Sequence, residues 1–382
     1  MSGAPAGPPG PIDVCHISFG GLGGQGVVVR TLAEQFAAQG LRNAVILHAP
    51  ADDLDDDPAN WPQFAQVEVV PRTGKLDLAA LAAVAGIIRR MRPRAVICHT
   101  HESVPAAFVG QLLGRRHPQL VLVEHQSMAL RRRLEDVRSL IALPFCRAVV
   151  VFTDAYARQY PFRRLPLPAV KRLTVVPNGV DTDRYAPRRD HPAATGPEPA
   201  FVIGRACRLI AIKDVDTLID AMALLSARPD TASARLVIAG EGPTRADLEA
   251  QTARLGLTDR VEFLGQLDEG SILDFYASLD AYALATLGES VSVALLEAYA
   301  CGLPVVASDV DGVGELVHDE VDGLLVAPQD APAFAAALTR LITDAALGAR
   351  LGAAARTRVE SDYSARAMAT GYLDLLRRLG AI

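Results

Sequence analysis

Short apolar runs alternate with longer segments of helical periodicity along the first half of the chain. The run Val14–Ser18 leads into a glycine-rich loop, and Leu120–Glu124 leads directly into His125. The strands predicted in this half are Val14–Ser18, Ala44–Ala49, Val67–Val70, Ala95–Cys98, Leu120–Glu124, Ala148–Phe152 and Leu173–Val176. The helices predicted between them include Val27–Gln39, Leu78–Met91 and Pro105–Leu113. This alternation favours a mostly parallel sheet covered on both faces.

The same alternation returns after Pro187–Pro199, a proline-rich stretch that we interpret as a linker. The strands predicted beyond it lie near Phe201–Ile203, Leu236–Ala239, Val261–Phe263, Ala281–Ala285, Val305–Ala307 and Leu324–Val326. From Ala331 onward the pattern is almost entirely helical. The sequence therefore predicts an α/β fold of two doubly wound, Rossmann-like domains that face each other across a ligand-binding cleft.

The predicted domain limits follow from this pattern and from the length of 382 residues, which suits two domains. Residues 1–12 are expected to form a flexible tail, residues 13–186 the first domain and residues 187–199 the linker. Residues 200–360 form the second predicted domain, and residues 361–382 a C-terminal helix that packs back on the first.

Composition narrows the class of protein. The net charge of −6 argues against a nucleic-acid-binding protein, which normally carries a basic excess. The five cysteines are scattered without a CxxC pair, as is typical of reduced thiols. The N-terminus resembles no signal peptide, and no apolar run reaches transmembrane length. We therefore expect a cytoplasmic protein.

The stretch Leu287–Pro304 carries two carboxylates, Glu289 and Glu297, eight positions apart. Glu289 is predicted to lie in a strand-to-helix loop and Glu297 about two turns into a helix that begins near Ser292. The start of such a helix binds anions, best of all phosphate. Carboxylates beside it make sense if they face sugar hydroxyls, so the ligand predicted here is a nucleoside-diphosphate sugar.

Arg208 and Lys213 bracket a loop after the first strand of the second half. Two cations at the carboxyl end of a strand can neutralise a diphosphate without a metal. Lys213 is predicted to start a helix, where a cation opposes the helix dipole, and a bound anion would explain its position. Arg205 is a second candidate for the arginine that binds the diphosphate.

Asp181-x-Asp183 and Asp309-x-Asp311 are interpreted as surface turns and not as metal ligands.

Gly21-x-Gly23-x-x-Gly26 follows a strand and opens a helix, as in dinucleotide-binding proteins. The acidic ribose-binding residue of that motif is missing at the end of the next strand. This absence favours two other interpretations of the glycines, a tight turn or a loop whose amides approach a phosphate or polar substrate.

Three histidines, His99, His101 and His125, follow predicted strands at the edge where ligands bind. We expect His125 to matter most, because it follows its strand directly.

Six motifs then occur in order between residues 173 and 328. They are Val176–Asp181 (VPNGVD), Arg208–Ile219, Ala239–Pro243 (AGEGP), Arg260–Gly265 (RVEFLG), Gly288–Ala298 and Gly302–Ser308 (GLPVVAS). Through them the second half closely resembles the retaining family 4 glycosyltransferases of GT-B architecture. The first half resembles that family more loosely, through Gly21–Gly26 and the position of His125.

The resemblance implies a role for each matching residue. Arg208 and Lys213 would bind the donor diphosphate, and Glu289 would bind hydroxyls of the transferred sugar. The resemblance also implies further donor contacts, namely Glu297 on the ribose, Ser290, Ser292 and Val293 near the phosphate, Leu264 and Leu267 beside the base, and Gly23 and Gly24 from the other domain. His125 would contact the sugar or stabilise the reacting centre. The family often has Gly-Phe-Gly where this chain has Ser290-Val291-Ser292, which narrows the donor space.

The implied activity is retaining transfer from a nucleoside-diphosphate sugar, UDP-sugar favoured, to a hydroxyl group without metal or further cofactor. The expected acceptor is a small molecule, such as an aminocyclitol or other secondary metabolite, or a glycan, and the acidic run Asp52–Asp57 could attract a cationic one. The alternative is a lipid-linked acceptor at a membrane, with Arg131–Arg133 on the headgroups. A nucleotide-sugar epimerase and an NAD-dependent enzyme are further alternatives. The oligomeric state, monomer or homodimer, stays open.

Overall fold

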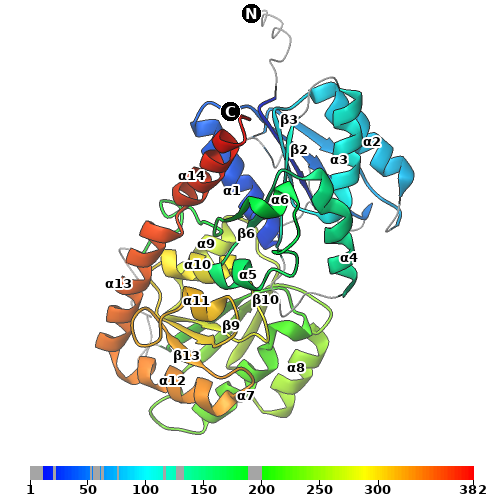
Figure 1. Ribbon diagram of the computed structural model, residues 1–382. Coiled ribbons are helices and arrows are strands. Elements are labelled where there is room, and N and C mark those ends of the chain that lie inside the picture. The colour runs from blue at the N-terminus through cyan, green and yellow to red at the C-terminus, as the bar shows by residue number, and fades with distance from the viewer. Residues whose placement is uncertain are drawn as a thin grey trace, which may run out of the picture. The chain divides into compact units, whose positions relative to one another are not determined.

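The computed structural model describes residues 12–19, 23–51, 54, 61, 64–74, 77–114, 118–125, 133–187 and 200–382 (Figure 1). Most of the predicted tail and of the predicted linker, Gly21, Arg131, Arg132 and the aspartates of Asp52–Asp57 lie outside them. The chain divides into two compact units. The first comprises Met1–His125, Arg131–Val176 and Met368–Ile382, and the second Gln126–Leu130 and Pro177–Ala367.

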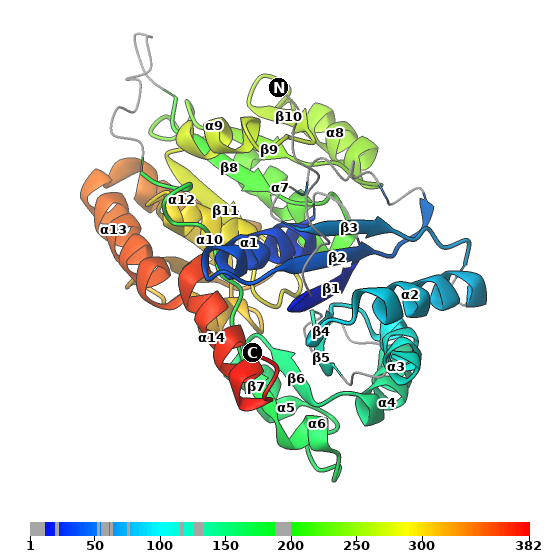
Figure 2. The same cartoon turned by 90° about the horizontal axis from the view of Figure 1, so that it is seen from above.

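The first unit contains a seven-stranded sheet in the order β3-β2-β1-β4-β5-β6-β7, and all its neighbouring strands are parallel. Its strands are β1 (Val14–Ser18), β2 (Asn43–Leu47), β3 (Gln66–Val69), β4 (Ala95–Cys98), β5 (Gln119–Val123), β6 (Ala148–Val151) and β7 (Leu173–Val175). Its helices are α1 (Gly24–Ala38), α2 (Leu78–Met91), α3 (Val104–Leu113), α4 (Arg133–Ala142), α5 (Asp154–Gln159) and α6 (Pro168–Lys171), with most of α14 (Ala365–Arg378). Helices α2, α3 and α4 lie side by side on one face of this sheet (Figure 2).

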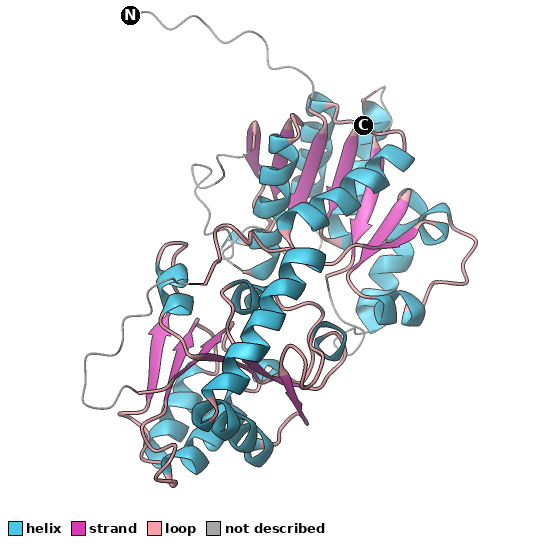
Figure 3. Cartoon of the chain, turned by 90° about the vertical axis from the view of Figure 1, so that its left-hand side faces the viewer, coloured by secondary structure: helices cyan, strands magenta, loops and turns pink. Residues whose placement is uncertain are grey.

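The second unit contains a six-stranded parallel sheet in the order β10-β9-β8-β11-β12-β13. Its strands are β8 (Val202–Ala206), β9 (Arg235–Ala239), β10 (Val261–Gly265), β11 (Ala281–Leu284), β12 (Val305–Ser308) and β13 (Leu324–Val326). Its helices are α7 (Val215–Ser226), α8 (Arg245–Arg254), α9 (Ser271–Ala277), α10 (Val293–Ala300), α11 (Val313–Leu316), α12 (Ala331–Thr343) and α13 (Ala345–Asp362). Helices cover each of the two sheets (Figure 3).

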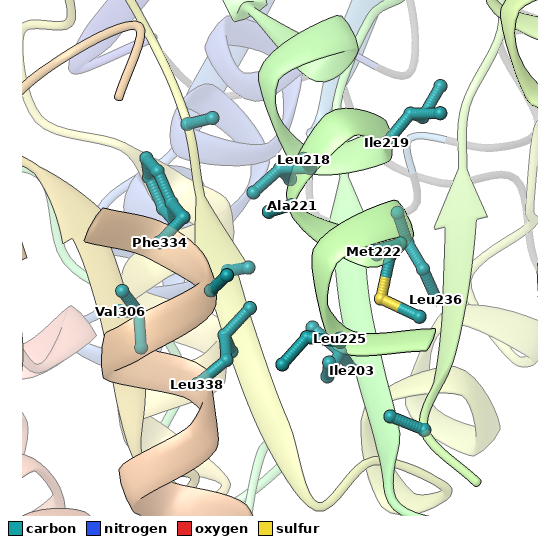
Figure 4. Close-up of a cluster of buried hydrophobic side chains, with 14 of the residues drawn as sticks. Ile203, Leu218, Ile219, Ala221, Met222, Leu225, Leu236, Val306, Phe334 and Leu338 are labelled. Carbon is teal, nitrogen blue, oxygen red and sulfur yellow. The ribbon is translucent and has the colours of Figure 1, made fainter. Parts of the chain in front are cut away.

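Fully buried strands explain the continuous apolar runs of the sequence. All five residues of β1 and of β2 are buried, as are all four of β11 and of β12, and parallel strands covered on both faces need such runs. In the second unit the apolar face of α7 packs with α12 over β8, β9 and β12 through residues such as Leu218, Met222 and Phe334 (Figure 4). The predicted fold class, two Rossmann-like parallel sheets covered by helices, is confirmed.

Both sheets reverse their strand order at one place, between β1 and β4 in the first and between β8 and β11 in the second. Loops that leave such a pair of strands diverge to opposite faces and open a crevice at the carboxyl edge, where ligands of doubly wound folds bind. The predicted site residues Lys213 and Glu289 follow β8 and β11, and Gly23 and His99 follow β1 and β4. The topology therefore places the predicted residues at the expected edges.

Candidate functional site

The first loop of the candidate site follows β8 and ends at Lys213. The chain forms a short 3-10 helix, Ala211–Lys213, and Asp214 then adopts the left-handed conformation with φ of 49° before α7 begins at Val215. The prediction that Lys213 starts the helix is therefore wrong, because the left-handed residue separates Lys213 from α7. The carboxylate of Asp214 holds this turn by accepting the hydroxyl of Thr217 at 2.9 Å.

Arg208 lies in the same loop and is exposed, and no hydrogen bond or ion pair joins its side chain to the described part of the chain. The backbone of the loop is fixed, since Leu209 N–H donates to the carbonyl oxygen of Glu241 at 2.8 Å. A Cβ at Gly240 or Gly242 would lie only 1.8 Å or 2.2 Å from a carbonyl oxygen of the Arg208 loop. Only glycine permits this approach, so the AGEGP motif supports the loop that presents Arg208.

Arg205 is excluded as an equivalent cation by its burial. It is 1% exposed, and its guanidinium donates to the hydroxyl of Tyr282 at 3.2 Å and to the carbonyl oxygen of Ala285 at 3.0 Å. A guanidinium fixed in this way supports the end of β11 and is not presented to a ligand. Between the two arginines, the geometry favours Arg208 as the diphosphate contact.

The second loop joins β11 to α10 and contains Glu289. Thr286, fully buried at its start, places its hydroxyl 3.0 Å from the carbonyl oxygen of Ile212. Leu287 N–H donates to the same oxygen at 2.9 Å. These two contacts tie the Glu289 loop to the 3-10 helix that ends at Lys213, so the two loops form one structural element.

Lys213 and Glu289 meet across the reversal of strand order. The Nζ of Lys213 lies 2.5 Å from Oε2 of Glu289, and their side chains are only 20% and 14% exposed. Limited exposure reduces the screening of such a pair by water, so each charge stabilises the other more than at an open surface. The structure thus brings together the predicted diphosphate cation and the predicted sugar-binding carboxylate.

Helix α10 begins at Val293, as predicted, with Ser292 as its N-cap. The hydroxyl of Ser292 accepts the N–H of Leu295 at 3.4 Å. The helix geometry leaves the N–H groups of Val293 and Ala294 without partners inside the helix. These groups, next to half-buried Ser290, are suited to an anion, in agreement with the predicted phosphate contact.

Glu297 is the fifth residue of α10, just over one turn into the helix. The predicted two turns were wrong, because Glu297 lies only four residues after Val293 and one turn takes about 3.6 residues. Glu297 is 6% exposed, and its Oε2 accepts the hydroxyl of Tyr276 at 2.7 Å. Burial raises the pKa of Glu297 to about 7, although hydrogen bonds from Tyr276 and Tyr185 oppose that rise. This carboxyl group is therefore already arranged around hydroxyl partners, as a ribose-binding residue would be.

Two predicted base contacts lie at the end of β10. Leu264 is exposed by 38% and Leu267 is half-buried in the loop that follows. Gly265 between them has a φ of 73°, which favours glycine and turns the chain after the strand. Their role beside a nucleobase stays a prediction.

In the first unit, Gly23 and Gly24 mark the start of α1, three residues before the predicted start. A Cβ placed on exposed Gly23 would meet no described atom within 4 Å. Packing within the described protein therefore does not require glycine at this position. The close approach of a ligand remains the reason to expect a glycine there.

His125 follows β5, and its Nε2 lies 2.9 Å from Nδ1 of His99. His101 is placed differently, because its Nε2 lies 2.8 Å from Oε2 of buried Glu124. Glu124 also accepts the hydroxyls of Ser139 at 3.1 Å and Tyr160 at 2.9 Å. His101 therefore belongs to a buried network that holds the end of β5, whereas His99 contacts the predicted active histidine.

The two aspartate pairs form turns, as predicted. The Oδ1 of Asp181 accepts the backbone N–H groups of Asp183 and Arg184, while Asp309 and Asp311 are exposed. Within the described ranges, no group of three or more histidine, cysteine or acidic side chains is arranged to hold a metal ion.

Sequence reasoning missed three supporting residues, namely His16, Tyr276 and Thr286. His16 was visible as a polar residue inside the apolar strand β1, and its Nδ1 lies 3.3 Å from Nε2 of His99. Tyr276 and Thr286 gave no such signal, because only the fold brings them to Glu297 and Ile212.

Comparison with known families matches most of the chain to glycosyltransferases. The family described as Glycosyltransferase Family 4 matches residues 22–184, and the family described as Glycosyl transferases group 1 matches residues 200–344. D-inositol 3-phosphate glycosyltransferase of Salinispora tropica is 36% identical over 201 residues, which are 48% of this chain and 42% of that protein. The chain thus matches less than half the length of that relative. Alpha-D-kanosaminyltransferase of Streptomyces kanamyceticus is 27% identical over 93% of this chain and 99% of its own length.

Two solved structures share the fold along nearly the whole chain. Anabaena HepE in complex with UDP superposes with a TM-score of 0.79 at 22% identity, and covers 96% of this chain and 99% of its own. Sucrose-phosphate synthase of Thermosynechococcus elongatus has the same TM-score at 24% identity, with the same coverage. At these identities the likeness shows the fold alone.

Proposed function

Because the chain belongs to the family 4 glycosyltransferases and has their GT-B fold, we propose that it transfers a sugar from a nucleoside diphosphate, most favourably UDP, to a hydroxyl group of its acceptor. The observation that carries this proposal is the contact between Lys213 and Glu289 at 2.5 Å. A nucleotide sugar needs a cation for its diphosphate beside a carboxylate for its sugar hydroxyls, and few other ligands need both.

The proposed donor site follows from the contacts. Arg208, exposed on its fixed loop, and Lys213 neutralise the diphosphate with the first N–H groups of α10. Glu289 releases Lys213 to the phosphate and accepts hydroxyls of the sugar. Glu297 accepts ribose hydroxyls beside Tyr276. This arrangement holds the donor without a metal ion.

We further propose retention of the anomeric configuration. The acceptor oxygen forms its bond to the anomeric carbon on the face from which the diphosphate departs. The bond between that carbon and the phosphate oxygen breaks with its electron pair on the diphosphate, which takes the proton of the acceptor hydroxyl. The cations Arg208 and Lys213 stabilise the charge that develops on the leaving group. The proposal assigns no covalent intermediate to Glu289.

The proposed acceptor is a small polyhydroxylated molecule, such as an aminocyclitol, or a glycan. Support comes from the names of relatives, one a kanosaminyltransferase and one acting on an inositol phosphate. The kanosaminyltransferase aligns along nearly its whole length, including the first unit.

A lipid-linked acceptor is the second candidate, and the outer surface of α3 and α4 favours it. Seven large apolar side chains there are 45% to 58% exposed, namely Val109, Leu112, Leu113, Leu134, Val137, Leu140 and Ile141. The described residues that α4 buries are the small Ser139 and Ala142, so its large apolar side chains face outward, unlike those of an ordinary surface helix. Residues 78–176 also contain 16 arginines and lysines against five acidic residues, which suits an anionic membrane surface. In the described part of the chain no helix is both long and apolar enough to cross a bilayer.

Calorimetric titration tests the donor site. The purified chain is titrated with UDP, GDP, dTDP and NAD, in EDTA and in Mg²⁺. We expect one nucleoside diphosphate to bind equally well in both, and Lys213→Ala to weaken that binding while the matched control Lys171→Ala does not. Binding of NAD alone, or equal binding by both variants, would overturn the proposal.

Transfer to a panel of cyclitols and glycans, compared with lipid acceptors in vesicles, decides between the two candidates. The anomeric proton of the product, read by NMR, tests retention. Sedimentation with anionic vesicles that is lost in Val137→Ser/Ile141→Ser, but not in the control Leu224→Ser, would favour the lipid acceptor.

A further inference from the structure

Three histidines form a hydrogen-bonded chain across three neighbouring strands of the first sheet. His16 lies within β1, His99 directly follows β4 and His125 follows β5, and these strands are adjacent in the sheet. The Nδ1 of His16 lies 3.3 Å from Nε2 of His99, and Nδ1 of His99 lies 2.9 Å from Nε2 of His125. The ring centroids are 5.6 Å and 5.2 Å apart.

The chain of imidazoles leads from an apolar interior to the carboxyl edge of the sheet. His16 is 0% exposed, lies against the rings of Phe36 and Phe64, and its Nε2 has no hydrogen-bond partner among the described residues. His99 is 4% exposed, whereas His125 is half-buried. The Nδ1 of His125 makes no hydrogen bond to a described residue. This nitrogen therefore ends the chain of imidazoles at the carboxyl edge of the sheet.

All three rings are neutral near pH 7. Burial lowers the pKa of His16 to about 3 and that of His125 to about 4, although nearby Glu124 opposes the latter shift. Burial lowers the pKa of His99 well below its usual range, and the neighbouring histidines lower it further. A neutral imidazole carries one N–H and one lone pair.

Two contacts and three neutral rings allow only two arrangements of protons. Each nitrogen–nitrogen contact needs one proton, and His99 has one to give. If His99 carries it on Nε2, then His16 and His125 also carry theirs on Nε2, and Nδ1 of His125 ends the chain as a lone pair. If His99 carries it on Nδ1, the other two do the same, and His125 ends the chain with an Nδ1–H donor.

The buried end of the chain selects between these arrangements. The first leaves the Nε2–H of His16 without a partner in an apolar pocket, and buried N–H groups without partners are rare in proteins. The second leaves only a lone pair there. The second is therefore favoured, although a free neutral imidazole in water prefers Nε2–H.

We propose that His16 and His99 are positioning residues that hold His125 as the neutral Nδ1–H tautomer, so that it donates a hydrogen bond to an uncharged oxygen of the substrate. That the oxygen belongs to a sugar or its acceptor rests on the proposed function. A neutral donor suits a hydroxyl or ring oxygen, whereas a charged imidazolium would also attract a diphosphate.

Nitrogen-15 NMR of the labelled full chain tests the tautomer directly, without any transfer assay. His48 serves as the internal reference, because its Nδ1 faces the carbonyl oxygen of Val70 at 3.1 Å and must carry the proton. We expect His125 to show the same pattern, with a protonated Nδ1 and an unprotonated Nε2. A protonated Nε2, or averaged shifts of a tautomer mixture, would overturn the proposal.

Substitution tests the relay. His16→Phe keeps an aromatic ring in the pocket but removes the hydrogen bond, and we expect the shifts of His125 to become averaged and kcat to fall several-fold with unchanged UDP affinity. His99→Gln, which can still accept from His16 and donate to His125, should retain more turnover than His99→Leu. An unchanged tautomer of His125 in His16→Phe would contradict the relay. If His125 shows the expected tautomer but the protein transfers no sugar, only the proposed function is contradicted.

Discussion

In the second unit, the loops after β8 and β11 present charged side chains, whereas in the first unit β1, β4 and β5 bring together neutral imidazoles. The two sheets share the same order of their six corresponding strands and the same reversal point. Lys213 and Glu289 form an ion pair at one edge, and His99 and His125 form a hydrogen bond between rings whose pKa values are lowered by burial at the other.

The difference shows that a shared fold fixes where ligands bind but not which chemistry they meet. Charges near a helix N-terminus suit a diphosphate, and neutral donors suit hydroxyl and ring oxygens. If each edge serves one part of a nucleotide-sugar reaction, substitutions at the charged edge should weaken nucleotide binding, and substitutions at the neutral edge should spare it.

The largest loss is expected from Lys213→Ala. Removal of the cation leaves the diphosphate charge uncompensated and Glu289 without its partner, so kcat/KM should fall on the order of 1000-fold, and UDP affinity should fall with it. Steady-state kinetics and calorimetry measure both quantities. Lys171→Ala, an exposed lysine of the first unit, is the control, and normal turnover of purified, folded Lys213→Ala would refute the role of the ion pair.

Glu297→Gln should remove a pH dependence of stability. The pKa of Glu297 is raised from 4.5 to about 7 in the folded protein, so the folded state binds more protons than the unfolded state between those values. This group therefore contributes on the order of 3 kcal/mol to the free energy of unfolding. The contribution is fully present below about pH 4.5 and is lost as pH rises through 7. Urea unfolding at pH 5 and pH 8 measures the loss in the wild type, and we expect it to disappear in Glu297→Gln.

The matched control is Glu262→Gln, since this carboxylate of the second unit is 52% exposed. Equal pH dependence in the wild type and in Glu297→Gln would mean that another group is responsible. Added UDP should reduce the difference in wild-type stability between pH 5 and pH 8 if Glu297 binds the ribose in its ionised form, because bound nucleotide then favours loss of the proton.

Sequence periodicity predicted the strands well because buried parallel strands are continuous apolar runs. The predicted Ala95–Cys98 and Leu324–Val326 have the observed bounds. Helix starts were less well predicted, as at Gly24, because glycine gives little helical signal although it is tolerated in the first turn. The family itself was recognisable from the order of its motifs, and the comparisons confirm it.

The supporting contacts could not be predicted from the sequence, because they join residues far apart in the chain. Thr286 meets Ile212 and Tyr276 meets Glu297 only after the sheet forms. The left-handed Asp214 was equally invisible, since only a few per cent of residues other than glycine adopt that conformation. Charged residues of the site were therefore easier to identify than the neutral residues that position them.

His125→Ala tests the neutral edge of the comparison. Loss of a neutral hydrogen-bond donor at the reacting sugar should lower kcat about 100-fold, while UDP affinity should stay within experimental error, because the diphosphate contacts lie in the second unit. Calorimetry with UDP and initial rates at saturating donor separate the two effects, with exposed His318→Ala as the control. Equal losses of kcat and affinity would mean that His125 serves nucleotide binding, and the division between a charged and a neutral edge would fail.

Gly23→Ala should have the smallest effect and is the most selective test of the first unit. A Cβ at Gly23 meets no described atom within 4 Å, and the same is true of Gly74, so neither Gly23→Ala nor Gly74→Ala should change the thermal unfolding midpoint. Only Gly23 is predicted to face the donor, where one added methyl group would displace the sugar and lower kcat/KM about tenfold. If both variants behave like the wild type, Gly23 is not close to the substrate. If Gly23→Ala is less stable than Gly74→Ala, the glycine serves the fold, and only a loss of turnover without a loss of stability supports contact with the ligand.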